Sequence, residues 1–300
     1  MTETIAFIGL GNMGLPMTTN LVKAGCKVQG WDVVPAANAA AASAGVSIAA
    51  SAAEAVKGAG VVISMLPDGK VVRDLYGSGI FKAAAPGTLF IDCSTIDVDS
   101  ARAAHKAAAA AGMESLDAPV SGGVGGAQAA TLTFMAGGSE KAFARAKTVL
   151  ERMGRKIVHC GGAGAGQAAK ICNNMILGIS MIAVGEAFVL AEKLGLSHQA
   201  MFDVASTSSG QCWALTTNCP VPGPVPASPA NNGYKPGFTA ALMLKDLLLS
   251  QEAAESGGAA TEFGRHAAEF YQKFVSAGQG GMDFSAVINA IRSASAPGKP

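Results

Sequence analysis

The first 32 residues constrain the fold of this chain more than any other segment. An apolar run over residues 5–8 is followed by the spacing G-x-G-x-x-G, a helix-like segment and a second strand pattern that ends at Asp32. In such a unit the first glycine permits a tight turn, the second lets the backbone approach a pyrophosphate, and the third lets the helix pack against the strand. The N-terminus of the helix then faces the phosphates. The pattern predicts a dinucleotide-binding turn made of Gly9, Leu10, Gly11, Asn12, Met13 and Gly14.

The acidic residue at the end of the second strand indicates which dinucleotide binds. Asp32 lies eighteen residues past Gly14, where a carboxylate can accept a hydrogen bond from a ribose 2′-hydroxyl. The next residues are Val33, Val34 and Pro35, so no arginine stands there to meet a 2′-phosphate, which Asp32 would repel. We therefore expect NAD rather than NADP as the cofactor. A glycine-rich turn without a ligand is the alternative. The strand patterns on both sides of the turn favour the dinucleotide site over this alternative.

Composition limits the classes of protein to which the chain can belong. Its 300 residues, 50% hydrophobic and 14% charged, suffice for one large domain or two ordinary ones. A net charge of +1 and 6% aromatic residues give no basic tract, so nucleic acid is not an expected partner. The first residues show no targeting pattern, and the longest uncharged apolar stretch, residues 171–185, is shorter than the ~20 residues of a membrane span. We expect a cytoplasmic protein without a membrane partner, in which this stretch is a buried helix.

The cysteines and histidines show no spacing typical of a metal or redox site. Six cysteines without a C-x-x-C motif predict buried free thiols in a reducing compartment. The four histidines have no metal-ligand spacing, so no metal cofactor is expected.

The two halves of the chain have different patterns. The first alternates short β-type runs with helical segments, which is typical of a parallel sheet covered by helices. Strands are expected at residues 5–9, 27–32, 61–66, 89–92, 113–117, 132–136 and 156–159. After the glycine run at residues 161–166 the pattern is helical, with helices expected at residues 167–194, 198–206, 240–255, 261–277 and 284–292 and an ordered loop at residues 218–236. The predicted fold class is α/β: a Rossmann-type dinucleotide-binding domain (residues 1–162), then a long interdomain helix and an all-α domain (residues 163–300).

A glycine-rich segment after the strand at residues 113–117 is a candidate anion site. In open α/β sheets, ligands bind outside the carboxyl ends of the strands. Ser121 offers a hydroxyl group, and Gly122 and Gly123 offer N–H groups that no side chain shields, which together suit a carboxylate. A flexible turn is the alternative.

Two lysines in apolar helices are candidate functional groups. Lys170 and Asn174 lie four residues apart, and therefore on one face of the long helix. Burial would lower the pKa of this lysine, which is the usual route to a lysine acid/base. A surface lysine in the first turn is the alternative, and spacing alone does not decide between them. For Lys245, which precedes Asp246, spacing alone favours an ion pair over a contact with the cofactor.

Taken together, these motifs resemble the β-hydroxyacid dehydrogenase family over nearly the whole chain. The stretches that carry the resemblance are residues 7–14, 117–126, 164–174 and 242–247. Residues 208–213 and 218–223 are similar to the branch that acts on 3-hydroxyisobutyrate. The implied reaction is the NAD-dependent oxidation of 3-hydroxyisobutyrate to methylmalonate semialdehyde, a step of valine catabolism. The resemblance also implies a homodimer or homotetramer assembled largely through the helical domain.

The resemblance implies roles that spacing left open. Lys170 would be the catalytic group, Ser121, Gly122 and Gly123 would hold the substrate carboxylate, and Asn174 would orient the substrate. Further contacts to the cofactor would come from Leu66, Pro67, Thr95 and Lys245.

The chain departs from the family pattern at a few positions, and alternative functions remain open. Val98 stands where a proline is common, Ala130 replaces a usual glycine, and Asn231 and Asn232 lie near an aromatic-rich loop by the site. That loop leaves the identity of the substrate open, so a reductase or dehydrogenase for another 3-hydroxy acid, such as tartronate semialdehyde or L-serine, is an alternative function. A non-catalytic dinucleotide sensor is another, although it would need neither Lys170 nor Asn174.

Overall fold

The computed structural model describes residues 3–295. The chain divides into two compact units, Met1–Lys170 and Ile171–Pro300. The sequence boundary after residue 162 stays a prediction of where the cofactor-binding domain ends.

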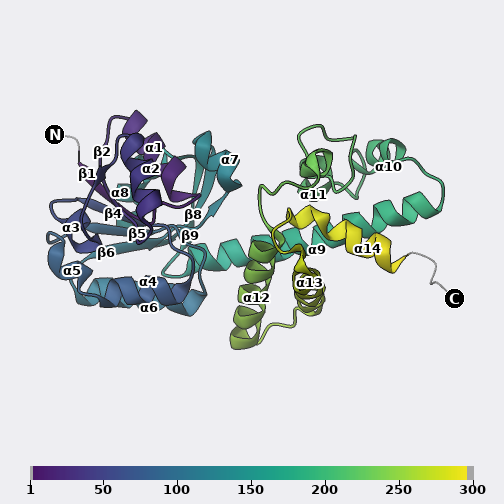
Figure 1. Cartoon of the computed structure of the whole chain (residues 1–300). Helices are drawn as coiled ribbons and strands as arrows, with labels where there is room; N and C mark the ends of the chain where they lie inside the picture. Colours follow the sequence, from purple (N-terminus) through teal and green to yellow (C-terminus); the bar gives the residue numbers. More distant parts are fainter. Residues whose placement is uncertain (1–2, 296–300) are drawn as a thin grey trace. The chain divides into compact units, whose positions relative to one another are not determined.

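The first unit alternates strands and helices, as its sequence pattern predicts (Figure 1). Its strands are β1 (Thr4–Ile8), β2 (Lys27–Trp31), β3 (Ser47–Ile48), β4 (Val61–Ser64), β5 (Leu89–Asp92), β6 (Glu114–Asp117), β7 (Val120–Ser121), β8 (Leu132–Gly138) and β9 (Gly154–Gly161). Its helices are α1 (Gly14–Lys23), α2 (Pro35–Ser43), α3 (Ala52–Val56), α4 (Gly69–Gly77), α5 (Ile80–Ala83), α6 (Val98–Ala110), α7 (Gly123–Gln128) and α8 (Glu140–Leu150), followed by the start of α9 (Ala165–Lys193).

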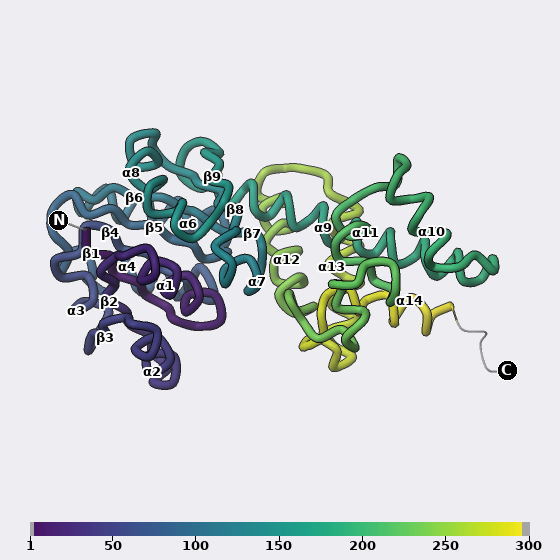
Figure 2. The backbone as a smooth tube through the Cα atoms, turned by 90° about the horizontal axis from the view of Figure 1, so that it is seen from above, coloured from purple at the N-terminus to yellow at the C-terminus, as the bar shows by residue number. Residues whose placement is uncertain are grey.

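These strands form one sheet in the order β3-β2-β1-β4-β5-β6-β8-β7, and β9 pairs with β8. The six strands from β3 to β6 are parallel, and their 3-2-1-4-5-6 order is that of the Rossmann fold. Figure 2 shows β3 and α2 at one edge, beside β2. The sheet departs from the expected parallel arrangement at β8, which runs antiparallel to β6 and β7. β7 runs in the same direction as β6, and the chain reverses in the short connection through α7 that leads to β8.

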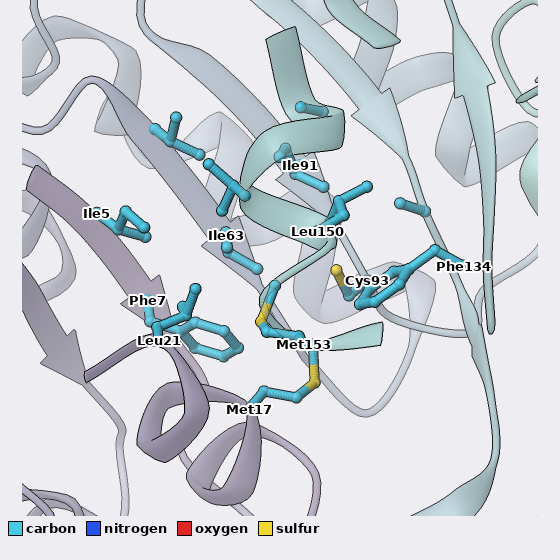
Figure 3. Close-up of a cluster of buried hydrophobic side chains, with 14 of the residues drawn as sticks. Ile5, Phe7, Met17, Leu21, Ile63, Ile91, Cys93, Phe134, Leu150 and Met153 are labelled. Carbon is cyan, nitrogen blue, oxygen red and sulfur yellow. The ribbon is translucent and has the colours of Figure 1, made fainter. Parts of the chain in front are cut away.

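Alternating side chains on the central strands build two hydrophobic cores, one on each face of the sheet. Ile5 and Phe7 of β1 belong to the first core, which also contains Met17 and Leu21 of α1 (Figure 3). Ala6 and Ile8, from the same strand, point to the second core, beneath α3 to α6. This period of two requires apolar residues at every position of a strand that is covered on both faces. Continuous runs such as the one at residues 5–8 therefore mark the central strands.

The second unit is helical. It contains the remainder of α9, α10 (His198–Ala205), α11 (Trp213–Thr216), α12 (Ala240–Gly257), α13 (Glu262–Phe274) and α14 (Ile288–Ala294), with short turns η1 (Pro229–Asn232), η2 (Val275–Gln279) and η3 (Phe284–Val287). Among the described residues no named strand follows β9, although Thr239 and Asp283 form an isolated antiparallel bridge. The helix predicted at 261–277 is α-helical to Phe274 and continues as the π-helical segment η2, and the helix expected at 284–292 begins as the 3₁₀ turn η3. The loop expected at residues 218–236 contains η1.

Small residues let the helices of this unit approach one another closely. A Cβ atom at Gly178 of α9 would lie 3.0 Å from Leu247 of α12, and one at Gly185 would lie 2.9 Å from Ile291 of α14. At the end of α9, Glu192 accepts a 2.6 Å hydrogen bond from Arg292, which lowers the pKa of the Glu192 carboxyl. These contacts hold α9 against its neighbours within the unit.

The long helix and the cysteines depart from the expected burial. By length and composition α9 could cross a membrane, a test that the core helix of a soluble protein also passes, and 44% of its most apolar stretch is buried. The expectation of a buried helix therefore holds for one face only, because side chains such as Ile176 are exposed. All six cysteines are free, as expected, but only three are buried: Cys160 and Cys212 are half-buried, and Cys172 is exposed.

Candidate active site

The glycine-rich turn between β1 and α1 has the geometry that its spacing predicts. Gly9 has a φ of +93°, in the left-handed region that glycine adopts without strain. A Cβ atom at Gly14 would lie 1.9 Å from the carbonyl oxygen of Gly9, so only glycine lets α1 start this close to the strand. A Cβ atom at Gly11 would meet no protein atom within 4 Å, and this open side is where the predicted pyrophosphate fits.

Asp32 follows the last residue of β2 and lies beside this turn. Its carboxylate accepts hydrogen bonds from the N–H groups of Leu10 (2.6 Å) and Val34 (2.8 Å). The backbone of Asp32 is held in turn by the side chain of Asn38, which contacts both its N–H and its C=O groups. The carboxylate is thus fixed beside the dinucleotide turn, and each oxygen keeps a lone pair for a further donor such as a ribose hydroxyl.

The loops after β4 and β5 carry the predicted contacts Leu66, Pro67 and Thr95, and a buried polar network joins the two loops. The N–H group of Leu66 donates to Ser94 Oγ (2.8 Å), which donates to Asp92 Oδ1 (2.6 Å). Ser64 donates to the same oxygen at 2.7 Å. Thr95, next in the chain to Ser94, is half-buried, and Pro67 is exposed.

Asp92 is an unusual group to find in this network. Within residues 3–295, its Oδ2 is the one buried side-chain polar atom without a hydrogen-bond partner. Burial raises the pKa of Asp92 to about 6, nearby Asp117 adds to the rise, and the hydrogen bonds from Ser94 and Ser64 oppose it. The carboxylate form is therefore costly in this position.

The candidate anion site follows β6. Ser121 ends β7 and is half-buried, and Gly122 and Gly123, with φ of +132° and +60°, turn the chain into α7. A Cβ atom at Gly122 would lie 3.2 Å from the side chain of Leu132, and the φ of +132° is one that residues with a side chain rarely adopt, so this position favours glycine. Nearby Ala130 has a φ of +54°, so the alanine that replaces the usual glycine occupies a left-handed conformation.

Lys170 lies in the second turn of α9 and is buried, with 7% of its surface exposed, so the alternative of a surface lysine is wrong. The start of the helix is held by Asp117 at the end of β6, which accepts hydrogen bonds from the N–H groups of Gly164 (2.8 Å) and Gln167 (2.9 Å). An anion at this end of a helix is favoured by the helix dipole. The backbone that carries Lys170 is therefore well fixed.

In the second unit, Asn174 and Asp246 join α9 to α12. The Asn174 side-chain amide donates to Asp246 and accepts from Asn173 (2.9 Å), and both Asn174 and Asp246 are buried. Lys245, next to Asp246, is half-buried. The roles of Asn174 and Lys245 stay predictions.

Two residues of the site region have no motif of their own and were missed by sequence reasoning. Ser94 joins the loops after β4 and β5, and Gln167 joins the second of these loops to α9. In the sequence, these two residues stand out only because they lie next to predicted site residues. Serine and glutamine are common in such positions, so their presence alone does not indicate a role. Among residues 3–295, no group of three or more His, Cys, Asp or Glu side chains could hold a metal ion.

Two family models together cover nearly the whole chain. The NAD binding domain of 6-phosphogluconate dehydrogenase matches residues 4–162, and a model described as NAD-binding of NADP-dependent 3-hydroxyisobutyrate dehydrogenase matches residues 164–291. A Rossmann unit with this dinucleotide turn, followed by such a helical unit, defines an NAD-dependent oxidoreductase.

Similar proteins of known name narrow this class. A probable 3-hydroxyisobutyrate dehydrogenase of Mycobacterium tuberculosis is 59% identical over 96% of this chain and 98% of that protein. The NAD-dependent L-serine dehydrogenase of Pseudomonas aeruginosa is 47% identical over 95% of this chain and 96% of its own length. A solved structure of the M. tuberculosis 3-hydroxyisobutyrate dehydrogenase with L-serine superposes with a TM-score of 0.94, at 59% identity, over 97% of this chain and all of that one. The chain belongs to the 3-hydroxyisobutyrate dehydrogenase family of β-hydroxyacid dehydrogenases, which confirms the fold class and the family predicted from the motifs.

Proposed function

We propose that this enzyme oxidises 3-hydroxyisobutyrate to methylmalonate semialdehyde in valine catabolism, with Lys170 as the acid/base. The observation that carries the proposal is the position of Lys170: a lysine with 7% exposure, on a helix start that Asp117 fixes, within the motif of the family. A buried lysine is costly unless a function or a partner maintains it. The name of the M. tuberculosis relative supports the choice of substrate.

The residues of this chain divide the work of the reaction. Bound NAD supplies the acceptor for the hydride that leaves C3 of the substrate. Lys170, in its neutral amine form, takes the proton of the 3-hydroxyl group, so that the C–O bond becomes the carbonyl of the semialdehyde. Ser121 and the N–H groups of Gly122 and Gly123 bind the substrate carboxylate. These steps account for both hydrogens removed from the alcohol.

The remaining assignments complete the proposal. Asn174 orients the substrate, and its place four residues after Lys170 on α9 supports this role. The dinucleotide turn, Asp32, Leu66, Pro67, Thr95 and Lys245 contact NAD. We also infer a cytoplasmic homodimer or homotetramer from the family resemblance, which size-exclusion chromatography with light scattering would test.

L-Serine is the second candidate substrate. One relative is named an L-serine dehydrogenase, and the matching solved structure is described with L-serine. L-Serine is also a 3-hydroxy acid, so the same carboxylate site and the same proton transfer apply to it. The two substrates differ in a methyl against an ammonium group at C2.

The proposal is tested by initial rates of NADH formation with three substrates: 3-hydroxyisobutyrate, L-serine and glycerate. Glycerate is the alcohol from which tartronate semialdehyde would form. We expect the highest kcat/KM for 3-hydroxyisobutyrate, and a preference for L-serine would reject that substrate. Lys170→Ala should lower kcat by about 10²–10⁴-fold with NAD binding nearly unchanged. Lys193→Ala, which removes an exposed lysine from the same helix, is the matched control. Retention of more than about a tenth of the activity by Lys170→Ala, a loss of about 1.4 kcal/mol, would reject the acid/base role.

A further inference from the structure

We propose that Gln167 is a positioning residue that fixes the Lys170 helix to the cofactor loop after β5. The inference rests on the proposed role of Lys170 and extends it to a residue outside the substrate and cofactor contacts named above. All the groups concerned lie within the unit Met1–Lys170.

The side chain of Gln167 spans the two peptide groups that flank Thr95. Its Nε2 donates to the carbonyl oxygen of Ser94 (2.7 Å), and its Oε1 accepts from the N–H group of Ile96 (3.2 Å). The side chain is completely buried, so both ends of the amide are paired with backbone rather than with water. Only a group that has one donor and one acceptor at this spacing can make both bonds. The Ser94–Ile96 loop is thereby held against the first turn of α9.

The main chain of Gln167 is held as well. Its N–H group donates to Asp117 Oδ2 at 2.9 Å, while Asp117 Oδ1 accepts from Gly164 and lies 2.9 Å from His105 Nε2. One residue therefore connects the end of β6, the loop after β5 and the start of α9. Through Ser94, whose hydroxyl accepts from Leu66, the connection reaches the loop after β4.

Lys170 follows Gln167 by three residues, less than one turn of helix. Residues three apart are neighbours on the helix surface, so the attachment point and the lysine move together. A rotation of the helix start by about 10° moves a side-chain tip, about 5–6 Å from the axis, by about 1 Å. A misplacement of about 1 Å can cost about 10²-fold in rate. The two hydrogen bonds of Gln167 are thus close enough to the lysine to set its position relative to Thr95.

Two substitutions separate this positioning role from packing. Gln167→Met keeps the length of the side chain and removes both hydrogen bonds. Gln167→Glu keeps an acceptor for Ile96 but places a carboxylate oxygen against the Ser94 carbonyl, and protonation at low pH restores a donor there. Gln199→Met, which replaces an exposed glutamine on α10, is the matched control and should leave kcat unchanged.

The test is a double-mutant cycle measured with the full-length enzyme under saturating NAD and hydroxy acid. We expect Gln167→Met to lower kcat by about 10–10²-fold in the wild-type background and by less than about 2-fold in Lys170→Ala, since a positioning residue acts through the group that it positions. An equal loss in both backgrounds, or an unchanged kcat in Gln167→Met, overturns the inference. An active Lys170→Ala enzyme is a different result, which rejects the proposed acid/base itself and the positioning role with it.

The pH profile of Gln167→Glu is a second, independent measurement. It tests the inference even if Gln167→Met does not fold. The ratio of its kcat to that of the wild type should rise as the pH falls from 9 to 6, because the protonated acid again donates to Ser94. A purely structural role would lower the melting temperature and leave this ratio flat. A flat ratio therefore overturns the inference.

Discussion

The buried carboxyl of Asp92 is expected to make the stability of the first unit depend on pH. Asp92 is 3% exposed, and its pKa is raised from 3.8 to about 6, chiefly by burial. Asp92→Asn preserves the shape and an oxygen for the two serine donors but removes the titration. We compare the free energy of unfolding of this variant with that of the wild type as a function of pH.

The sign and size follow from proton linkage. Because the pKa of Asp92 is higher in the folded state, the folded state binds more protons than the unfolded state between pH 3.8 and about 6. The wild type therefore loses stability as the pH rises through this interval, and the loss is complete above about pH 6. A shift of about 2 pKa units corresponds to about 3 kcal/mol. Part of this change falls below pH 4.5, so the stability of Asp92→Asn relative to the wild type should rise by about 2 kcal/mol between pH 4.5 and pH 8.

Urea denaturation followed by circular dichroism at pH 4.5, 6 and 8 measures this difference. Asp99→Asn, which removes an exposed carboxylate from α6 of the same unit, controls for the change in net charge. A difference between Asp92→Asn and the wild type that stays constant across these pH values would refute the reasoning, since the pKa of Asp92 would then not be raised in the folded state.

Three further predictions concern the cofactor site and the helical core. Asp32→Ala should weaken NAD binding and narrow the preference for NAD over NADP, because the carboxylate that repels a 2′-phosphate is lost; equal losses for both cofactors, measured by fluorescence titration, would show that Asp32 acts only on the turn. Gly14→Ala should lower the melting temperature strongly, since its Cβ atom would lie 1.9 Å from backbone, whereas Gly11→Ala should fold normally yet bind NAD weakly; similar melting curves for the two variants would contradict the packing argument. Phe188→Ala, at a fully buried position of α9, should destabilise the second unit by about 3–5 kcal/mol in urea titrations, and a loss below about 1 kcal/mol would show that the site collapses around the cavity.

The central strands and long helices were predictable because their patterns are long and periodic. The run at residues 5–8 and the glycines after it determine β1 and the turn, and β5 begins and ends where the pattern predicts, at Leu89 and Asp92. The two-residue strands β3 and β7 were missed, because two residues carry no periodicity and their pairing depends on distant partners. The strand β8 was predicted, but its direction was missed, because direction depends on the distant strands with which it pairs.

The candidate site also contains features that the sequence predicts and features that it does not. Local motifs predicted the dinucleotide turn and the segment around Lys170, and the turn has the geometry that its spacing predicts. The sequence did not reveal the hydrogen bonds of Gln167 to Ser94 and Ile96, which bring together residues more than 70 positions apart. It also left the burial of Lys170 undecided, since burial depends on the elements that surround α9. Contacts between distant segments are therefore what the structure adds.

The attachment of α9 at its first turn also determines where the chain tolerates a change of length. Asp117 holds the N–H groups of Gly164 and Gln167, and each residue of an α-helix advances the direction of its side chain by about 100°. A residue inserted at 162–163 lies before the attachment and leaves the direction of Lys170 unchanged. A residue inserted between Gln167 and Lys170 turns the lysine through more than a quarter of a circle. Natural variation in length should therefore accumulate at residues 161–163 and stop at Gly164, where the attachment begins.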